Sequence, residues 1–288
     1  GPTAGTNIRN NRIGTDVAGT ANWGMQANGI LIENSLGGAG PTNIYISSNT
    51  VAFSGQGSAY DAGIAVLGTG GANISISANS IYSNVGMGID LGVAGVTAND
   101  AGDADTGPNQ LQNFPVLTLA RTNGSDTLTV GGTLNSTAST SFKIEVFSNP
   151  TLDAGGYGEG RTSLGTFVVT TNASGDVTFS NPFSVAVAVG QYITATASRY
   201  SGGFTYATSE FSRGVAAISS TQASITVDTV SDANDGDTTS LSTLLANKGS
   251  DGFVSLREAI IAANNTANGT GGADRIQFSI AGPGPHSI

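Results

Sequence analysis

Two acidic loops hold the residues of this chain best suited to chemistry. The first carries Asp100, Asp103 and Asp105 among alanines and glycines, and the second carries Asp232, Asn234, Asp235 and Asp237. Carboxylate and amide oxygens are the ligands that Ca²⁺ prefers, and glycine permits the tight turn that brings them together. Neither loop has the Glu at position twelve of an EF-hand, and Asp, Asn and Gly also favour ordinary solvated turns. Calcium sites are therefore predicted at both loops, with solvated acidic turns as the alternative.

The composition excludes several other classes of site. Cysteine is absent and His286 is the single histidine, so a thiolate centre or a multi-histidine metal site is not expected. Ten basic against 20 acidic residues give a net charge of −10, which argues against nucleic acid as a partner. No apolar run is long enough to span a bilayer, so no membrane insertion is expected. The few charged residues and the abundance of Asn, Gly, Ser and Thr fit an extracellular or cell-surface protein.

The first third of the chain repeats. Asn11, Asn49 and Asn79 each lie in a segment that reads apolar, two variable residues, Asn, one variable residue, apolar. The flanking apolar residues alternate with a period of two, which predicts strands with one buried face. Repeats of this length are typical of solenoids, so the three asparagines are expected to stack as an internal ladder. Glu33 and Asp90 are expected to point outward, so no row of catalytic carboxylates forms.

The later segments follow other patterns. From Phe114 to Glu210, seven short alternating segments separated by turns predict an immunoglobulin-like β-sandwich. The last part predicts a strand at 224–230, a helix at 255–264 and a strand at 275–280. Ser255 and Glu258 have the spacing of a capping box, and Leu256 and Ile260 lie on one apolar face of the helix.

These patterns bear a family resemblance. The repeat resembles the right-handed parallel β-helix of pectate-lyase-like proteins, and the residues from 254 to 259, Val-Ser-Leu-Arg-Glu-Ala, resemble the Cys-Ser-Leu-Arg-Glu-Ala leader of bacterial surface β-helix proteins, with Val254 in place of Cys. The resemblance implies an all-β chain with parallel β-helix coils at 1–112, an immunoglobulin-like β-sandwich at 113–218 and a strand-helix-strand capping segment at 219–288. In that family the helix caps the mouth of a β-helix, which makes Ser255, Leu256, Glu258 and Ile260 the expected assembly residues.

The order of these parts suggests self-association. A β-helix end at one terminus and a β-helix beginning at the other predict a structural or adhesive surface protein rather than an enzyme. Such a protein would stack head-to-tail or in tandem repeats and form a fibre or stalk. The alternative is a circularly permuted single chain, in which the C-terminal β-helix beginning joins the N-terminal β-helix end and each covers the exposed strands of the other. Two further functions remain open: a calcium-dependent glycan-binding adhesin, with Trp23, Tyr45, Tyr60 and Tyr82 as a stacking strip, and a fragment of a polysaccharide lyase or hydrolase.

Overall fold

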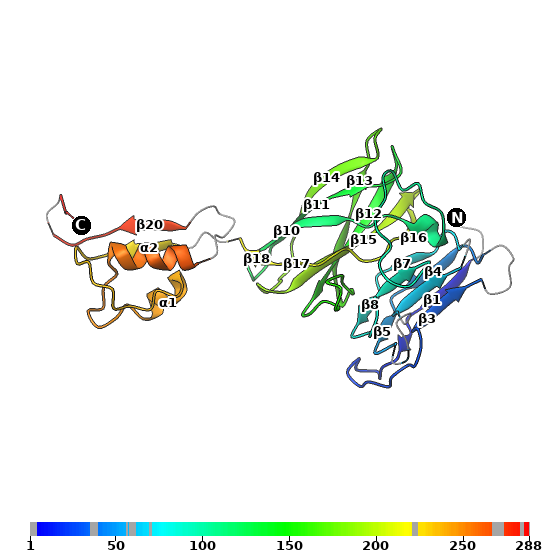
Figure 1. Cartoon of the computed structure of the whole chain (residues 1–288), viewed down its shortest axis with the longest axis horizontal. Helices are drawn as coiled ribbons and strands as arrows, with labels where there is room; N and C mark the ends of the chain where they lie inside the picture. The colour runs from blue at the N-terminus through cyan, green and yellow to red at the C-terminus, as the bar shows by residue number, and fades with distance from the viewer. Residues whose placement is uncertain are drawn as a thin grey trace. The chain divides into compact units, whose positions relative to one another are not determined.

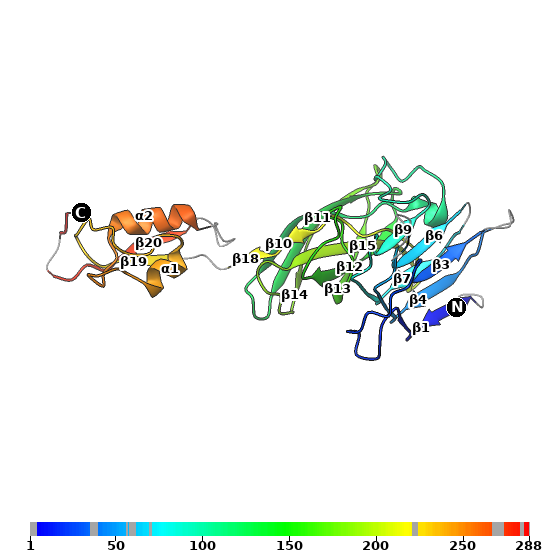
Figure 2. The same cartoon turned by 60° about the horizontal axis from the view of Figure 1, so that its bottom comes forward.

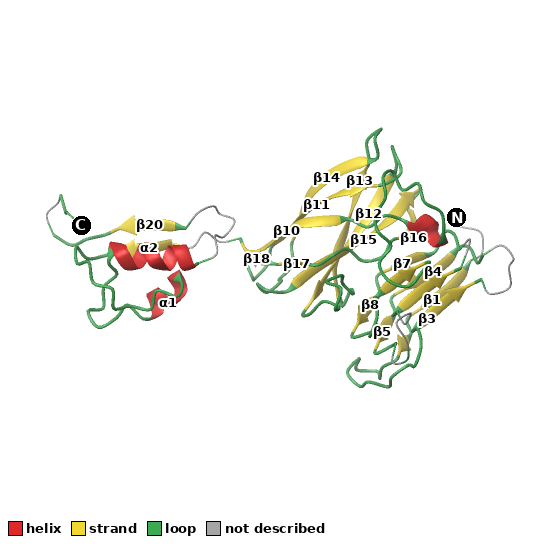
Figure 3. Ribbon diagram, viewed as in Figure 1, coloured by secondary structure: helices red, strands yellow, loops and turns green. Residues whose placement is uncertain are grey.

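Strands dominate the regular structure of the chain (Figure 3). The computed structural model describes residues 5–34, 40–55, 57, 62–68, 71–220, 224–266, 274–282 and 285–287. The prediction of an all-β chain is confirmed. The chain divides into two compact units, described separately below: unit 1 is Gly1–Ala120 with Gly124–Ala217, and unit 2 is Arg121–Asn123 with Ile218–Ile288.

In the described part of the first third of unit 1, the strands form three parallel sheets of three strands each (Figures 1 and 2). The first sheet comprises β1 (Thr6–Arg9), β4 (Ile44–Ser47) and β7 (Ser75–Ser77). The second comprises β2 (Arg12–Ile13), β5 (Thr50–Ala52) and β8 (Ser80–Tyr82). The third comprises β3 (Ile30–Glu33), β6 (Ile64–Leu67) and β9 (Ile89–Leu91). Each sheet therefore takes one strand from each of the three repeats.

The sequence repeat fixes the register of these sheets. Ile8 pairs with Ile46, which pairs with Ile76, so equivalent aliphatic residues lie above one another. The same holds for Ile13, Val51 and Ile81 and for Ile30, Ile64 and Ile89. These side chains belong to one apolar core that all three sheets share. A shift of one residue would turn every one of them outward, so the apolar pattern specifies the pairing.

The turn next to each repeat asparagine is made by the residue that precedes it. The left-handed residues are Asn10, Ser48 and Ala78, with φ of 58°, 57° and 54°, each directly before a repeat asparagine. The preceding residue makes the corner, and this leaves the asparagine side chain pointing along the stack.

The rest of unit 1 consists of two antiparallel sheets that share a second core. One sheet contains β10 (Val116–Thr122), β11 (Leu128–Asn135) and β14 (Asp176–Phe183). The other contains β12 (Ser141–Asn149), β13 (Thr162–Thr170), β15 (Tyr192–Ser201), β16 (Phe204–Thr208) and β17 (Val215–Ala216). A 3₁₀ segment, η1 (Pro108–Leu111), precedes them. The seven strands expected between 116 and 210 are all present.

Unit 2 is a small mixed structure around a core of its own. Its strands β19 (Ser224–Val227) and β20 (Arg275–Phe278) pair in parallel, and its helices are α1 (Leu241–Ala246) and α2 (Leu256–Asn265). The short strand β18 (Ile218–Ser219) pairs with Arg121 and Thr122, which belong to the same unit. Helix α1 was not expected, because its six residues span less than two turns.

Candidate functional site

The repeat asparagines are connected through the interior of the stack. The side-chain oxygen of Asn49 accepts hydrogen bonds from the backbone and side-chain nitrogens of Asn11, both at 3.0 Å. Asn79 Oδ1 accepts the equivalent pair from Asn49, also at 3.0 Å. Asn49 and Asn79 are 2% and 4% exposed, whereas Asn11 is exposed at the open edge. Each buried amide thus satisfies polar groups of a neighbouring layer.

A second such contact was not predicted from the sequence. Asn84 Oδ1 accepts a hydrogen bond from Ser54 N at 3.0 Å, and Asn84 Nδ2 donates to Val51 O at 3.2 Å. Ser54 and Asn84 follow the paired residues Val51 and Ile81 by the same number of positions. This equivalent position is visible in the sequence, but Asn84 has no counterpart asparagine at Ser54, so no repeat indicated the contact.

Three glutamates from the second half of unit 1 close the last layer of the stack. Both carboxylate oxygens of Glu145 accept from Ala78 N, at 3.1 and 3.0 Å, and Oε1 also accepts from Ser163 Oγ at 3.0 Å. Glu159 Oε1 accepts from the backbone and side-chain nitrogens of Asn84, at 2.9 and 2.6 Å. Glu210 accepts from Leu91 N and Thr97 N, both at 3.0 Å. A carboxylate is the stronger acceptor for such groups, so each glutamate satisfies donors that a further layer would otherwise take.

Other groups complete the same closure. Ile74 N donates to Asn109 Oδ1 at 2.8 Å, and Ile76 N donates to Thr208 Oγ1 at 2.9 Å. Ile81 N donates to Gly160 O at 2.9 Å. The backbone donors of Ile74, Ile76 and Ile81, in or next to β7 and β8, are therefore all paired with residues outside the parallel sheets. None of these acceptors was singled out from the sequence, because their partners lie 35 to 132 positions away.

Burial shifts the proton affinity of these carboxyl groups. Burial raises the pKa of Glu159 to about 7 and that of Glu210 to about 8, against the opposing effect of the N–H donors. The pKa of Glu145 is also raised by burial. Removal from water disfavours the charged form, which is why all three move in the same direction.

Asp90 does not point into solvent as its place in the strand suggested. It is 3% exposed, and burial raises its pKa to about 6. Its negative charge in turn raises the pKa of Glu210. The alternation of β9 does place Asp90 opposite the core residues, but the chain that carries Glu210 covers that face. Glu33 is exposed, in agreement with the expectation for that residue.

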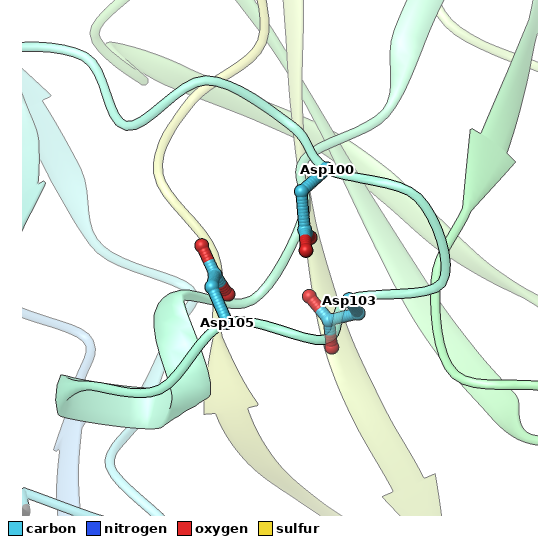
Figure 4. Close-up of side chains that lie close together, drawn as sticks. All are labelled: Asp100, Asp103 and Asp105. Carbon is cyan, nitrogen blue, oxygen red and sulfur yellow. The ribbon is translucent and has the colours of Figure 1, made fainter.

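The first acidic loop brings its three carboxylates together. Ligand atoms of Asp100, Asp103 and Asp105 all lie within 4.8 Å of one another (Figure 4). Asp103 is engaged by Asn113 N at 2.8 Å and by Arg199 Nη2 at 3.2 Å. In contrast, Asp100 Oδ1 and Asp105 Oδ1 are shielded from solvent and have no hydrogen-bond partner. The pKa of Asp105 is raised by burial and then by the charges of the other two aspartates. Uncompensated carboxylate oxygens of this kind suit a hard cation such as Ca²⁺.

The second acidic loop is arranged differently, and its carboxylates do not converge. Asp232 forms an ion pair with Arg257, and Asp235 Oδ2 accepts hydrogen bonds from Ser250 N and Oγ at 2.7 and 2.5 Å. Asp237 Oδ1 accepts from Thr239 N at 3.1 Å, and Asn234 is exposed. Among the described residues, the loop therefore offers no single ligand set. Each aspartate instead closes a local turn or pairs with a base.

The predicted assembly residues divide into buried and exposed positions. Ser255 and Glu258 form the capping box of α2 and are each 1% exposed. Glu258 Oε1 also accepts hydrogen bonds from Asp235 N and Gly236 N, at 2.9 and 2.7 Å, so it anchors the acidic loop. Leu256 packs against the core of unit 2, whereas Ile260 is 45% exposed. The buried residues of α2 are Glu258, Ala259 and Ala262, and Ile260 lies outside this buried face.

Of the four aromatic residues predicted to form a glycan-stacking strip, the three that the structure describes differ in exposure. Trp23 is 70% exposed and Tyr45 is half-buried. Tyr82 is 9% exposed, donates its hydroxyl to Gly19 O at 2.5 Å and lies beneath Arg161, whose guanidinium carbon is 4.7 Å from the ring centroid. Tyr60 lies outside the described residues. Tyr82 is thus a packing residue and not part of a surface strip.

Comparison with known proteins does not assign the chain to a family. No protein-family model matches the chain, and no curated protein matches it significantly. One solved structure that matches is chitinase ChiW from Paenibacillus sp. str. FPU-7, described as a bacterial cell-surface-expressed multi-modular enzyme. The match has 12% identity and a TM-score of 0.19, and it covers 65% of this chain and 18% of the chitinase chain. In the described part of the chain, no helix is long and apolar enough to cross a membrane.

Proposed function

We propose that this chain is a structural module of an extracellular or cell-surface protein. Its parallel sheets would form a short right-handed parallel β-helix, its antiparallel sheets an immunoglobulin-like sandwich that closes one end, and unit 2 a leader that begins another β-helix. The observation that carries the proposal is that one end of the stack is sealed by side chains while the other is an edge. Three glutamates serve this seal: Glu145 and Glu210 are 6% and 1% exposed, and Glu159 is half-buried.

The open edge is formed by β1, β2 and β3, which are edge strands in the described part of the chain. Ile8 and Ile13 are only partly buried there, although their equivalents Ile46 and Val51 are 0% exposed. Unpaired backbone groups beside partly covered aliphatic residues favour the addition of another strand. The edge therefore supports further layers.

Unit 2 has a strand suited to that edge. β20 is paired with β19 on one side, and Ile276 packs against the core of unit 2. If the other side of β20 pairs with β1 of a second copy, Ile276 continues the column of Ile8, Ile46 and Ile76. Repetition of this contact would give a head-to-tail stack, and the same contact would join consecutive modules of a tandem repeat.

Association of the isolated chain tests this function. Sedimentation velocity between about 5 and 500 μM is expected to show an average mass that rises with concentration. Ile8→Lys would place a charge on the open end of the apolar column and is expected to shift the chain to monomer at the same concentrations. The matched control is Asn7→Lys, on the outward face of the same strand, which is expected to associate like the unmodified chain.

The association experiment has a clear negative outcome. A chain that sediments as a monomer throughout the concentration range would reject head-to-tail stacking. Equal association of the Ile8→Lys and Asn7→Lys variants, both verified as folded by circular dichroism, would place the contact elsewhere.

Calcium binding by Asp100, Asp103 and Asp105 is a second proposal, supported by the two shielded and unpartnered oxygens. The affinity expected for extracellular calcium modules is about 0.1–1 mM, so 10 mM Ca²⁺ is expected to raise the Tm of unit 1 by roughly 3–8 °C. Asp105→Asn is expected to abolish most of this increase. Without calcium the same substitution is expected to raise the Tm slightly, because it removes one of three repelling charges.

Differential scanning calorimetry with and without Ca²⁺ measures both effects. Asp126→Asn, which removes an exposed carboxylate outside the cluster, serves as the control and is expected to respond to calcium like the unmodified chain. An identical calcium response in the Asp105→Asn variant would show that the ion binds elsewhere or that the effect is ionic strength alone.

A further inference from the structure

A groove of about 190 Å³ lies where β4 and β7 meet β16. Its lining residues combine aromatic rings with amide and hydroxyl groups: Asn43, Tyr45, Asn73, Phe204, Thr205 and Tyr206. We infer that this groove binds one ring of a neutral oligosaccharide. The inference is independent of the proposed stacking function and of calcium.

The repeat positions one wall of the groove. Asn43 and Asn73 occupy the same corner in successive layers, with φ of 56° and 59°, and Asn73 Nδ2 donates to Asn43 Oδ1 at 3.4 Å. Tyr45 follows Asn43 on β4 and lies between the buried residues Ile44 and Ile46, so its side chain is on the outer face. The parallel sheet thus presents a tyrosine beside two stacked amides.

The antiparallel part of unit 1 supplies the other wall. β16 is fastened beside β7 by a hydrogen bond between the hydroxyls of Ser75 and Thr205 at 2.8 Å and by one from Thr208 N to Ile74 O at 3.1 Å. These contacts hold Phe204 and Tyr206 at the groove. Phe204 remains 48% exposed, which is unusual for a phenylalanine unless the site has a ligand or a partner.

The chemistry of the lining fits a sugar better than a purely apolar or a charged ligand. Aromatic rings offer flat faces for the C–H groups of a pyranose, and amide and hydroxyl groups can bond its hydroxyls in either direction. Within the described part of the chain, the hydroxyls of Tyr45 and Tyr206 have no hydrogen-bond partner and are available to a ligand. No charged side chain lines the groove, and the net charge of −10 opposes an acidic glycan.

The size of the groove limits the affinity. It is smaller than the roughly 300–1,000 Å³ typical of sites for drug-sized ligands, so it would hold a single ring while the rest of the glycan lies on the surface. At the usual free energy per ligand atom, one ring gives a Kd on the order of 1 mM. Weak single sites of this kind become effective when many copies engage one polysaccharide.

The test uses the full chain with four probes: cellohexaose, chitohexaose, mannohexaose and hexagalacturonate. Binding is measured by isothermal titration calorimetry and by saturation-transfer NMR. At least one of the three neutral probes is expected to bind with a Kd on the order of 1 mM, and the acidic probe is expected to bind at least tenfold more weakly. Phe204→Ala and Tyr206→Ala are each expected to weaken binding at least tenfold.

The control variant is Phe253→Ala, which removes a phenylalanine of similar exposure, 50%, in unit 2 and is expected to leave binding unchanged. Circular dichroism verifies that each variant is folded. The inference is overturned if none of the neutral probes binds, if hexagalacturonate binds most tightly, or if folded Phe204→Ala and Tyr206→Ala variants bind like the unmodified chain.

Discussion

Raising the pH from 5 to 8.5 is expected to lower the free energy of unfolding of unit 1 by an amount on the order of 6 kcal/mol. The pKa of Glu159 is about 7 and that of Glu210 about 8 in the folded chain, both above the ordinary value of 4.5. Between pH 4.5 and 8 the folded state therefore holds protons that the unfolded state has released. Stability is greatest below the unfolded pKa and is lost as the pH rises through the folded values.

Urea unfolding followed by circular dichroism at pH 5, 6, 7 and 8.5 measures this dependence. The control is the double variant E159Q/E210Q, whose amides cannot ionise and whose stability is expected to change much less with pH. Asp228, Asp235 and Asp237 of unit 2 have lowered pKa values, so their effect appears only at more acidic pH. A double variant with the pH dependence of the unmodified chain, or stability that increases with pH, would contradict the assignment.

Asn79→Ala is expected to destabilise unit 1 by about 3–5 kcal/mol. Asn79 Oδ1 accepts two hydrogen bonds from Asn49, and Asn79 Nδ2 donates to Ile46 O at 2.8 Å and to Ser77 O at 3.1 Å. Alanine removes all four bonds, and the partners at Asn49 and Ile46 are buried where water does not replace them. The cost is that of several unsatisfied polar groups rather than of one lost contact.

The first asparagine of the ladder supplies the matched control. Asn11 lies in the same sequence pattern as Asn79, but it is exposed at the edge of the stack. Water therefore satisfies the polar groups that lose a partner in Asn11→Ala. Its expected cost is below about 1 kcal/mol. Chemical denaturation of both variants at the same pH gives the comparison. Equal losses for the two substitutions would mean that the ladder stabilises the stack no more inside than at its edge.

The sequence predicted those parts of the fold that depend on local pattern. The alternation of Ile44 with Ile46 and of Ile74 with Ile76 fixed both strand and register, because the period of two leaves one way to bury these side chains. The capping box at Ser255 and Glu258 likewise depends on residues three positions apart. Asp100, Asp103 and Asp105 of the first acidic loop do meet, but similar spacing in the second loop did not bring its carboxylates together, so the spacing alone does not decide convergence.

What the sequence did not predict depends on distant partners. In the sequence, the glutamates that seal the stack cannot be told from ordinary surface glutamates. Only their contacts with Ala78, Asn84 and Leu91 show their role. Asp90 was misplaced for the same reason, since strand alternation gives the direction of a side chain but not what covers it. The sugar-sized groove combines residues of two repeats with residues more than 100 positions further on, so no local pattern marked it.

The sealing of the stack by Glu210 also has a consequence for the order in which the chain is completed on the ribosome. Leu91 N lacks its acceptor until Glu210, 119 positions later in the chain, has been synthesised. At about 5–20 residues per second, translation leaves this amide without its acceptor for roughly 6–24 s. During that interval the nascent parallel strands have two exposed ends instead of one, and a chaperone or a neighbouring nascent chain can reach the second end only then.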